Sequence, residues 1–164
     1  MTQETLNYVV EKTKELMEEL KTTGKYTITP EMKEKLADFA AGYSTEEETA
    51  ESIHDTYQKT GYVMDTHTAV AAHVCGQYRA KSGDQTKCVI ASTASPYKFV
   101  KSVMSAIDAE NANADEFNLL PKLQEVSGVP MPQAIKDILD AKVLHDLECD
   151  EDKMKDTVKR ILGV

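Results

Sequence analysis

The sequence predicts a helix-rich α/β chain with seven or eight helices and two or three short strands. Apolar residues recur at helical spacing along most of the 164 residues. Three short apolar runs, at 26–29, 61–65 and 87–91, favour extended chain instead. Because so few strands cannot form a self-sufficient doubly wound sheet, we expect a portion of a larger α/β protein.

The amino-terminal part, residues 1–45, is expected to hold helices and the short strand at 26–29. The first helix ends at Thr-Thr-Gly, residues 22–24, and we expect it to lay an apolar stripe on a core. That stripe consists of Leu6, Val9, Val10, Thr13, Leu16, Met17 and Leu20. Pro30 is typical of the first turn of a second helix, which follows the strand.

The middle part, residues 46–108, is expected to form an α/β core. Two hydroxyl residues each precede a glutamate by three positions and so form capping-box candidates: Ser44 with Glu47, and Thr45 with Glu48. The helix that they begin must end before Gly61. Asp65 or Thr66 is then placed to cap the next helix, whose small residues allow a neighbour to approach closely.

Segment 87–91, Lys-Cys-Val-Ile-Ala, is the best strand candidate, and Pro96 opens another helix shortly after it. The carboxyl-terminal part, residues 109–164, is expected to hold helices near 121–126, after Pro132 and at the end of the chain. Asp150 or Asp152 is a candidate cap for the last of these, and its stripe contains Met154, Val158, Ile161 and Leu162.

Composition excludes several classes of partner. The formal net charge is −9 and the basic residues form no dense cluster, so we predict no nucleic-acid or membrane partner. Neither a long apolar span nor a signal-peptide pattern is found, and we expect a cytoplasmic protein. Cys75, Cys88 and Cys149 share no CxxC spacing, which favours reduced and mostly buried thiols.

Three common site patterns are missing from the sequence. The seven glycines are too dispersed for a glycine-rich phosphate loop. No two of the histidines, His54, His67, His73 and His145, have the i, i+4 spacing of a metal-binding helix, so we predict no metal site. A G-x-S-x-G nucleophile elbow is also missing.

The Ser-Thr-Ala-Ser loop at 92–95 follows a candidate strand and precedes a helix. Ligands of α/β proteins collect at such strand ends, and Ser92 and Thr93 offer hydroxyls that can meet a ring nitrogen, a phosphate or a carboxylate. The alternative is structural, because Ser95 can cap the helix while the other hydroxyls satisfy backbone groups. The residues alone leave both readings open.

Two ordered motifs connect this chain with a known family. The first resembles GY-x-x-D-P-H-T-A-V-A and is carried by Asp65, His67, Thr68, Ala69 and Val70. The second resembles a hydrophobic strand ending in S-T-A-H-P-x-K-F and is carried by Ser92, Thr93, Ala94, Pro96, Lys98 and Phe99. With these motifs, the chain resembles the carboxyl-terminal part of threonine synthase, a fold-type-II pyridoxal-phosphate enzyme with the tryptophan-synthase-β-like fold.

The resemblance implies conversion of O-phosphohomoserine to threonine and phosphate, with pyridoxal phosphate as cofactor. It further implies that Thr93, and second Ser92, bind the pyridine nitrogen of the cofactor, and that no residue of this chain is catalytic. The family's Schiff-base lysine motif and phosphate loop do not occur here, so we expect a chain that is inactive alone. Its expected partner is the missing amino-terminal part of the enzyme.

This chain departs from the family pattern at Thr66, where proline is usual, and at Ser95, where histidine is usual. These changes keep open an alternative function, a non-catalytic binding or regulatory module that retains this part of the fold. A plain helical interaction protein is supported by the acidic helices alone. Since a strand at 87–91 would leave an edge unpaired, self-association through that edge is a further expectation.

Overall fold

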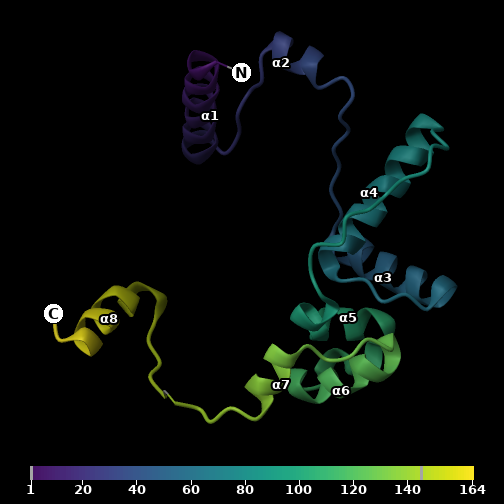
Figure 1. Ribbon diagram of the computed structural model, residues 1–164, viewed down its shortest axis with the longest axis vertical. Helices are drawn as coiled ribbons and strands as arrows, with labels where there is room; N and C mark the ends of the chain where they lie inside the picture. The colour runs from purple at the N-terminus through teal and green to yellow at the C-terminus, as the bar shows by residue number, and fades with distance from the viewer. Residues whose placement is uncertain (1, 145) are drawn as a thin grey trace. The chain divides into compact units, whose positions relative to one another are not determined.

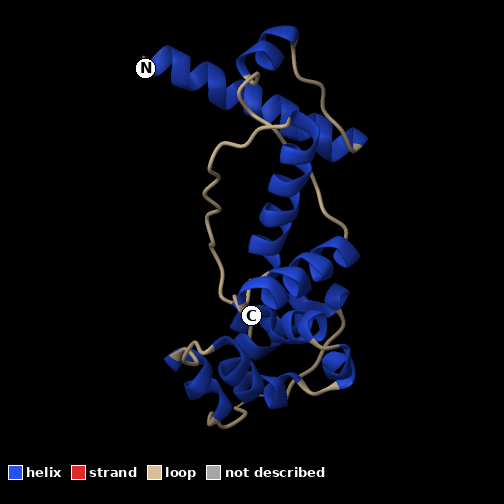
Figure 2. Ribbon diagram, turned by 90° about the vertical axis from the view of Figure 1, so that its right-hand side faces the viewer, coloured by secondary structure: helices blue, strands red, loops and turns tan. Residues whose placement is uncertain are grey.

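The computed structural model describes residues 2–144 and 146–164, and its regular structure is helical (Figures 1 and 2). The α-helices are α1 (Gln3–Thr23), α2 (Pro30–Lys35), α3 (Glu46–Thr60), α4 (Thr66–Ser82), α5 (Val100–Ile107), α6 (Glu116–Ser127), α7 (Gln133–Leu139) and α8 (Met154–Leu162). Three 3₁₀ helices accompany them: η1 (Pro96–Phe99), η2 (Ala109–Asn113) and η3 (Glu151–Lys153). The eight α-helices of the described residues confirm the helix-rich class predicted from the sequence.

The strand predictions for 26–29 and 87–91, in contrast, are wrong for the residues that the structure describes, whereas 61–65 is the buried extended segment that was the alternative to a strand there. Segments 26–29, 61–65 and 87–91 are extended or irregular and belong to no sheet. A strand is stable only when a neighbouring strand satisfies its backbone groups, and the described residues offer none of these segments such a neighbour. The strand edge through which self-association was expected is therefore not formed in them.

The chain divides into two compact units, and the buried core lies in one of them. The first unit contains residues 1–43 and 74–87, and the second contains residues 44–73 and 88–164. In the second unit, which we call the core unit, α5 contacts both α3 and α6 (Figure 1). The buried apolar side chains of the core unit are Ile53, Val63, Met64, Ala69, Tyr97, Val100, Val103, Met104, Leu119, Leu120, Leu123 and Met131.

Helix α3 begins and ends where the sequence predicts. Of the two capping-box candidates, Thr45 with Glu48 is formed: the Glu48 amide donates to the Thr45 hydroxyl at 3.2 Å, and the Thr45 amide donates to the Glu48 carboxylate at 2.7 Å. Gly61 ends the helix in the left-handed conformation with φ of 73°. The entry to the following segment, 61–65, is thus fixed locally.

The buried positions of segment 61–65 explain why it reads as a strand. Val63, Met64 and Asp65 are all buried, with exposed fractions of 6%, 4% and 1%. The segment passes through the core unit as a short extended connection between α3 and α4. The apolar residues of this segment correctly indicated that it is buried. A buried segment is not a strand, however, unless it pairs with another strand.

In the first unit, Gly42 permits close approach of the chain to α4. A Cβ atom at Gly42 would lie 2.9 Å from Cγ1 of Val74, a distance at which one of the two must move. This close approach is made possible by a glycine outside α4, and not by the small residues of α4 on which the expectation rested. Gly76, one of the small residues of α4, would place a Cβ in open space, so no neighbour requires a glycine there.

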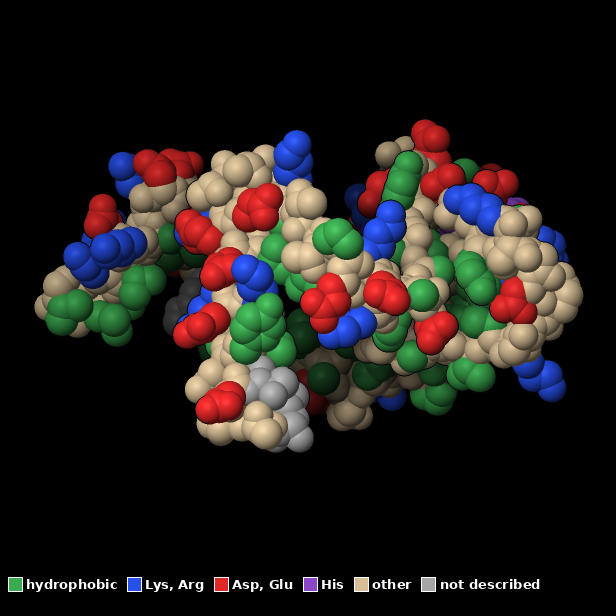
Figure 3. Space-filling view, turned by 90° about the horizontal axis from the view of Figure 1, so that it is seen from above, with side chains coloured by type: hydrophobic (Ala, Val, Ile, Leu, Met, Phe, Trp, Pro, Cys, Tyr) green, Lys and Arg blue, Asp and Glu red, His purple; other side chains and the backbone are tan. Residues whose placement is uncertain are grey.

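Several apolar side chains expected in a core are instead exposed. In α1, Leu6, Val9, Val10, Met17 and Leu20 are each 40% exposed or more, and the predicted stripe of α8 is also exposed. Figure 3 shows apolar side chains on the surface among the charged ones. Cys88 and Cys149 are exposed and Cys75 is half-buried, so the prediction of mostly buried thiols is wrong.

The two errors about the stripes of α1 and α8 share one cause, because helical periodicity shows which face of a helix is apolar and does not show whether this chain covers that face. No helix among the described residues is long and apolar enough to cross a membrane.

Candidate functional site

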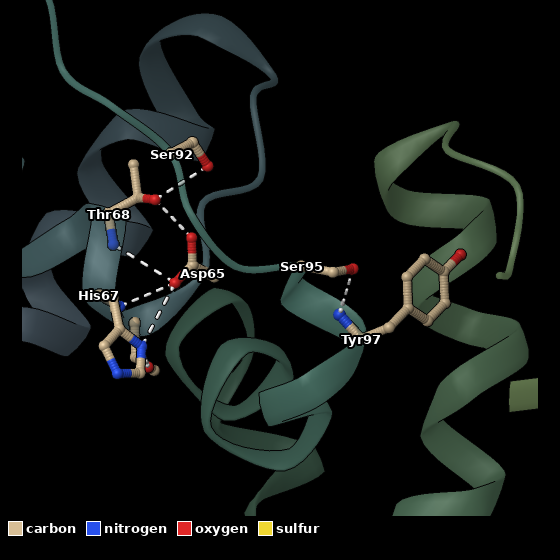
Figure 4. A network of polar contacts seen from close by, with 7 residues as sticks. Asp65, His67, Thr68, Ser92, Ser95 and Tyr97 are labelled. Carbon is tan, nitrogen blue, oxygen red and sulfur yellow. Dashed lines mark hydrogen bonds and ion pairs between the residues drawn. The ribbon is translucent and has the colours of Figure 1, made fainter. Parts of the chain in front are cut away.

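Asp65 caps α4 from a buried position in the core unit (Figure 4). Its Oδ1 atom accepts hydrogen bonds from the amides of His67, at 2.9 Å, and Thr68, at 3.3 Å. Its Oδ2 atom accepts a short hydrogen bond from the Thr68 hydroxyl. The carboxylate therefore satisfies the first turn of the helix and one side chain of that turn, which confirms Asp65 as the cap.

Thr68 connects this cap to the Ser-Thr-Ala-Ser loop. Its hydroxyl oxygen lies 3.0 Å from that of Ser92, and Thr68 itself is only 5% exposed. A threonine hydroxyl has a single proton, which Thr68 gives to the acceptor-only carboxylate of Asp65. Ser92 therefore completes the chain of hydrogen bonds by donating its own proton to Thr68. We call Asp65, Thr68 and Ser92 the Asp-Thr-Ser relay.

His67 does not form a strong pair with Asp65. Its Nδ1 atom is 3.5 Å from Asp65 Oδ1, which is long for a hydrogen bond, and its side chain is 62% exposed. The imidazole instead lies against the Phe99 ring, with centroids 5.0 Å apart. The geometry favours a helix start over a carboxylate-imidazole catalytic pair.

Thr93 follows the relay and lies on the surface of the core unit. Its side chain is exposed, and it makes no hydrogen bond to any described residue. Its hydroxyl can therefore donate a hydrogen bond to a neutral ring nitrogen without first breaking a bond within the chain. Of the two predicted site residues, Ser92 is engaged by Thr68, and Thr93 is available.

Ser95 has a structural role at the start of η1. Its hydroxyl accepts from the Tyr97 amide at 3.3 Å, and Pro96 follows it as the first helical residue. The cap expected at Ser95 is thus present, but among the described residues the hydroxyls of Ser92 and Thr93 satisfy no backbone group, as the structural reading also required. The position where the family pattern has histidine is occupied by a helix cap, which cannot shuttle a proton at neutral pH.

Tyr97 anchors η1 to the loop that follows α6. It is 3% exposed, and its hydroxyl donates to the Val129 carbonyl at 2.6 Å. Burial raises the pKa of the Tyr97 phenol, and a hydrogen bond with Ser127 partly opposes that rise. The phenol is neutral at pH 7 and acts as a fixed donor that holds the start of η1 in the core unit.

No three histidine, cysteine or acidic side chains of the described residues come together in a way that could hold a metal ion. His54, for example, faces the backbone, with its Nδ1 atom 3.1 Å from the Ala106 carbonyl oxygen. His145, which was considered with the other histidines, lies outside the described residues.

Comparison with known proteins defines this helical unit as a carboxyl-terminal synthase domain. A family model described as "Threonine synthase, C-terminal" matches residues 68–158, more than half of the chain. The match begins at Thr68 and includes Ser92 and Thr93. This chain belongs to the threonine synthase family and corresponds to its carboxyl-terminal region.

Individual relatives agree with this assignment. The chain is 33% identical over 121 residues to threonine synthase-like 1 of Pongo abelii, covering 68% of this chain and 16% of that protein. It is 32% identical over 111 residues to threonine synthase of Saccharomyces cerevisiae, covering 64% of this chain and 22% of the relative. With threonine synthase of Schizosaccharomyces pombe it shares 35% identity over 95 residues, 57% of this chain and 18% of the relative.

Thr68 is the site residue that sequence reasoning missed. It was seen as part of a motif, without a role of its own. A signal was present, since Thr68 is three residues after the candidate cap Asp65, where a side chain can reach the capping carboxylate. Its contact with Ser92, 24 positions later, depends on tertiary structure and has no local signature.

Proposed function

We propose that this chain forms the carboxyl-terminal part of an enzyme that converts O-phosphohomoserine to threonine and phosphate with pyridoxal phosphate. Membership of the threonine synthase family is the observation that carries this proposal. The chain spans 16% to 22% of the length of the relatives named above, so the rest of the machinery would come from other residues. The cofactor, when bound, supplies an electron sink for the substrate carbanion.

Thr93 is the residue that we propose to meet the cofactor ring. A small neutral hydroxyl fits an unprotonated pyridine nitrogen, to which it can donate a hydrogen bond. The exposed and unengaged side chain of Thr93 is compatible with this role, and Ser92 stands beside it as the second candidate. Ser92 is the weaker candidate because its proton is directed to Thr68 in the relay.

Apolar side chains next to Thr93 support a covering partner. Val89 is 92% exposed and Ile90 is 37% exposed in the extended segment that leads to Ser92. Leaving such side chains in water is unfavourable, and a neighbouring protein surface would bury them. We propose the amino-terminal part of the enzyme as that surface, with self-association as the competing occupant when it is absent.

We further propose that the chain alone does not turn over substrate. Its sequence contains neither the S-F-K-D-like context of the Schiff-base lysine nor a glycine-rich phosphate loop. Lys98, the lysine nearest to Thr93 in the sequence, instead has its Nζ atom 5.3 Å from the centroid of the Phe99 ring.

The proposal is tested by mixing the chain with a separately produced amino-terminal part of the yeast relative and measuring phosphate release from O-phosphohomoserine. We expect turnover from the mixture and none from either part alone. Turnover by this chain unaided would contradict the proposal.

The alternative function is a non-catalytic binding or regulatory module, and the cap formed by Ser95 favours it. A serine engaged with the Tyr97 amide replaces a histidine of the family pattern, so any proton transfer by that histidine would be lost. In the mixing experiment, tight association without turnover would support this module and would count against the enzyme.

A further inference from the structure

The extended segment that carries Thr93 is attached to the core unit by a single hydrogen bond within the described residues. Residues 89–94 make no other described hydrogen bond or ion pair, and this one joins Ser92 to Thr68. The segment is otherwise exposed, apart from the half-buried Ala94. The position of Thr93 therefore depends on this hydrogen bond.

On the α4 side, buried neighbours hold the Thr68 hydroxyl of this hydrogen bond in place. Asp65 and Thr68 are 1% and 5% exposed, and the carboxylate orients the Thr68 hydroxyl at the first turn of the helix. Two amide donors fix the carboxylate in turn. A buried, fully paired network of this kind has one low-energy arrangement, whereas the exposed segment alone has many.

We propose that Thr68 is a positioning residue: through Ser92 it holds the neighbouring Thr93 where that side chain can meet the cofactor ring. The inference rests on the proposed function for the identity of the group that Thr93 meets. It gives the Asp-Thr-Ser relay a purpose beyond capping α4, since Asp65 could cap the helix without any contact to Ser92 (Figure 4).

Two substitutions remove the hydrogen bond between Thr68 and Ser92, one from each side, and a third retains it. Thr68→Val keeps the shape of the side chain and removes its hydroxyl, whereas Ser92→Ala leaves the Asp65-Thr68 bond intact. Thr68→Ser is the matched control, because it retains the hydroxyl. Backbone ¹⁵N relaxation of the 164-residue chain reads the mobility of residues 91–93 directly.

We expect order parameters near about 0.85 for residues 91–93 in the wild type and in Thr68→Ser, and values below about 0.6 in Thr68→Val and Ser92→Ala. The double variant should be no more mobile than either single one, because both remove the same link. Unchanged order in Thr68→Val and Ser92→Ala, with α4 still folded, would overturn the inference.

A second measurement tests whether the Asp-Thr-Ser relay affects the binding of the cofactor. In the complex with the amino-terminal part, fluorescence titration of pyridoxal phosphate should show about fivefold weaker binding for Thr68→Val and Ser92→Ala, the effect of one lost hydrogen bond, and recovery in Thr68→Ser. Higher mobility with unchanged affinity would overturn the positioning role and leave the proposed function standing. A wild-type complex that binds no cofactor would contradict the proposed function itself.

Discussion

Replacing Asp65 by alanine tests how much the buried cap contributes to the core unit. The substitution removes the acceptor for the amides of His67 and Thr68, a loss of about 1 kcal/mol for a typical cap. It also removes the acceptor for the buried Thr68 hydroxyl, which costs about 1 to 2 kcal/mol further unless Ser92 takes that proton. We therefore expect the free energy of unfolding to fall by about 2 to 3 kcal/mol.

Urea unfolding followed by circular dichroism at 222 nm measures this change. Asp65→Asn should cost less than Asp65→Ala, since the amide oxygen still caps the helix and the amide nitrogen can donate to Thr68. Thr45→Ala is the matched control, because Thr45 is an exposed cap whose lost bonds water replaces, at about 1 kcal/mol. If Asp65→Ala were no more damaging than Thr45→Ala, the buried network would add nothing to stability.

Three further substitutions test the packing. Tyr97→Phe should cost about 1 kcal/mol by removing the donor to the Val129 carbonyl. Because the folded pKa of Tyr97 is raised, the wild type should lose stability above about pH 10 more steeply than Tyr97→Phe, and parallel pH curves would refute this. Gly42→Ala should lower the free energy of unfolding by about 1 to 3 kcal/mol through its clash with Val74, whereas an unchanged free energy of unfolding would show that Val74 moves aside at no cost. Leu123→Ala, at a fully buried site, should cost about 2 to 5 kcal/mol in the same unfolding assay, and a loss under 1 kcal/mol would place Leu123 outside the core.

Local signals in the sequence predicted the helix boundaries well. The Thr45-Glu48 box, Gly61 and Asp65 each act through backbone groups only a few residues away, so their spacing contains the needed information. The helix near 121–126 was found but begins earlier, at Glu116, because Asp115 caps it ahead of Pro121. Pro121 lies inside the helix, which continues past it to Ser127.

The features that the sequence did not predict depend on contacts with residues or surfaces that are distant along the chain. The run at 87–91 has strand composition, yet a strand requires a partner and Val89 remains exposed. The stripe of α8 is regular in sequence, but regularity does not say what covers it. For the candidate site, the sequence pointed to Ser92 and Thr93 as a prediction, but it gave no sign of the contact between Ser92 and the buried Thr68.

The most direct test of the account is the affinity of the assembled complex for pyridoxal phosphate when Thr93 is changed. Thr93→Val keeps the shape and removes the hydroxyl, while Thr93→Ser keeps the hydroxyl. We predict about tenfold weaker cofactor binding for Thr93→Val and near wild-type binding for Thr93→Ser, as expected for one lost hydrogen bond in a closed site. Equal affinity of the wild type and Thr93→Val would contradict the proposed contact between this chain and the cofactor ring.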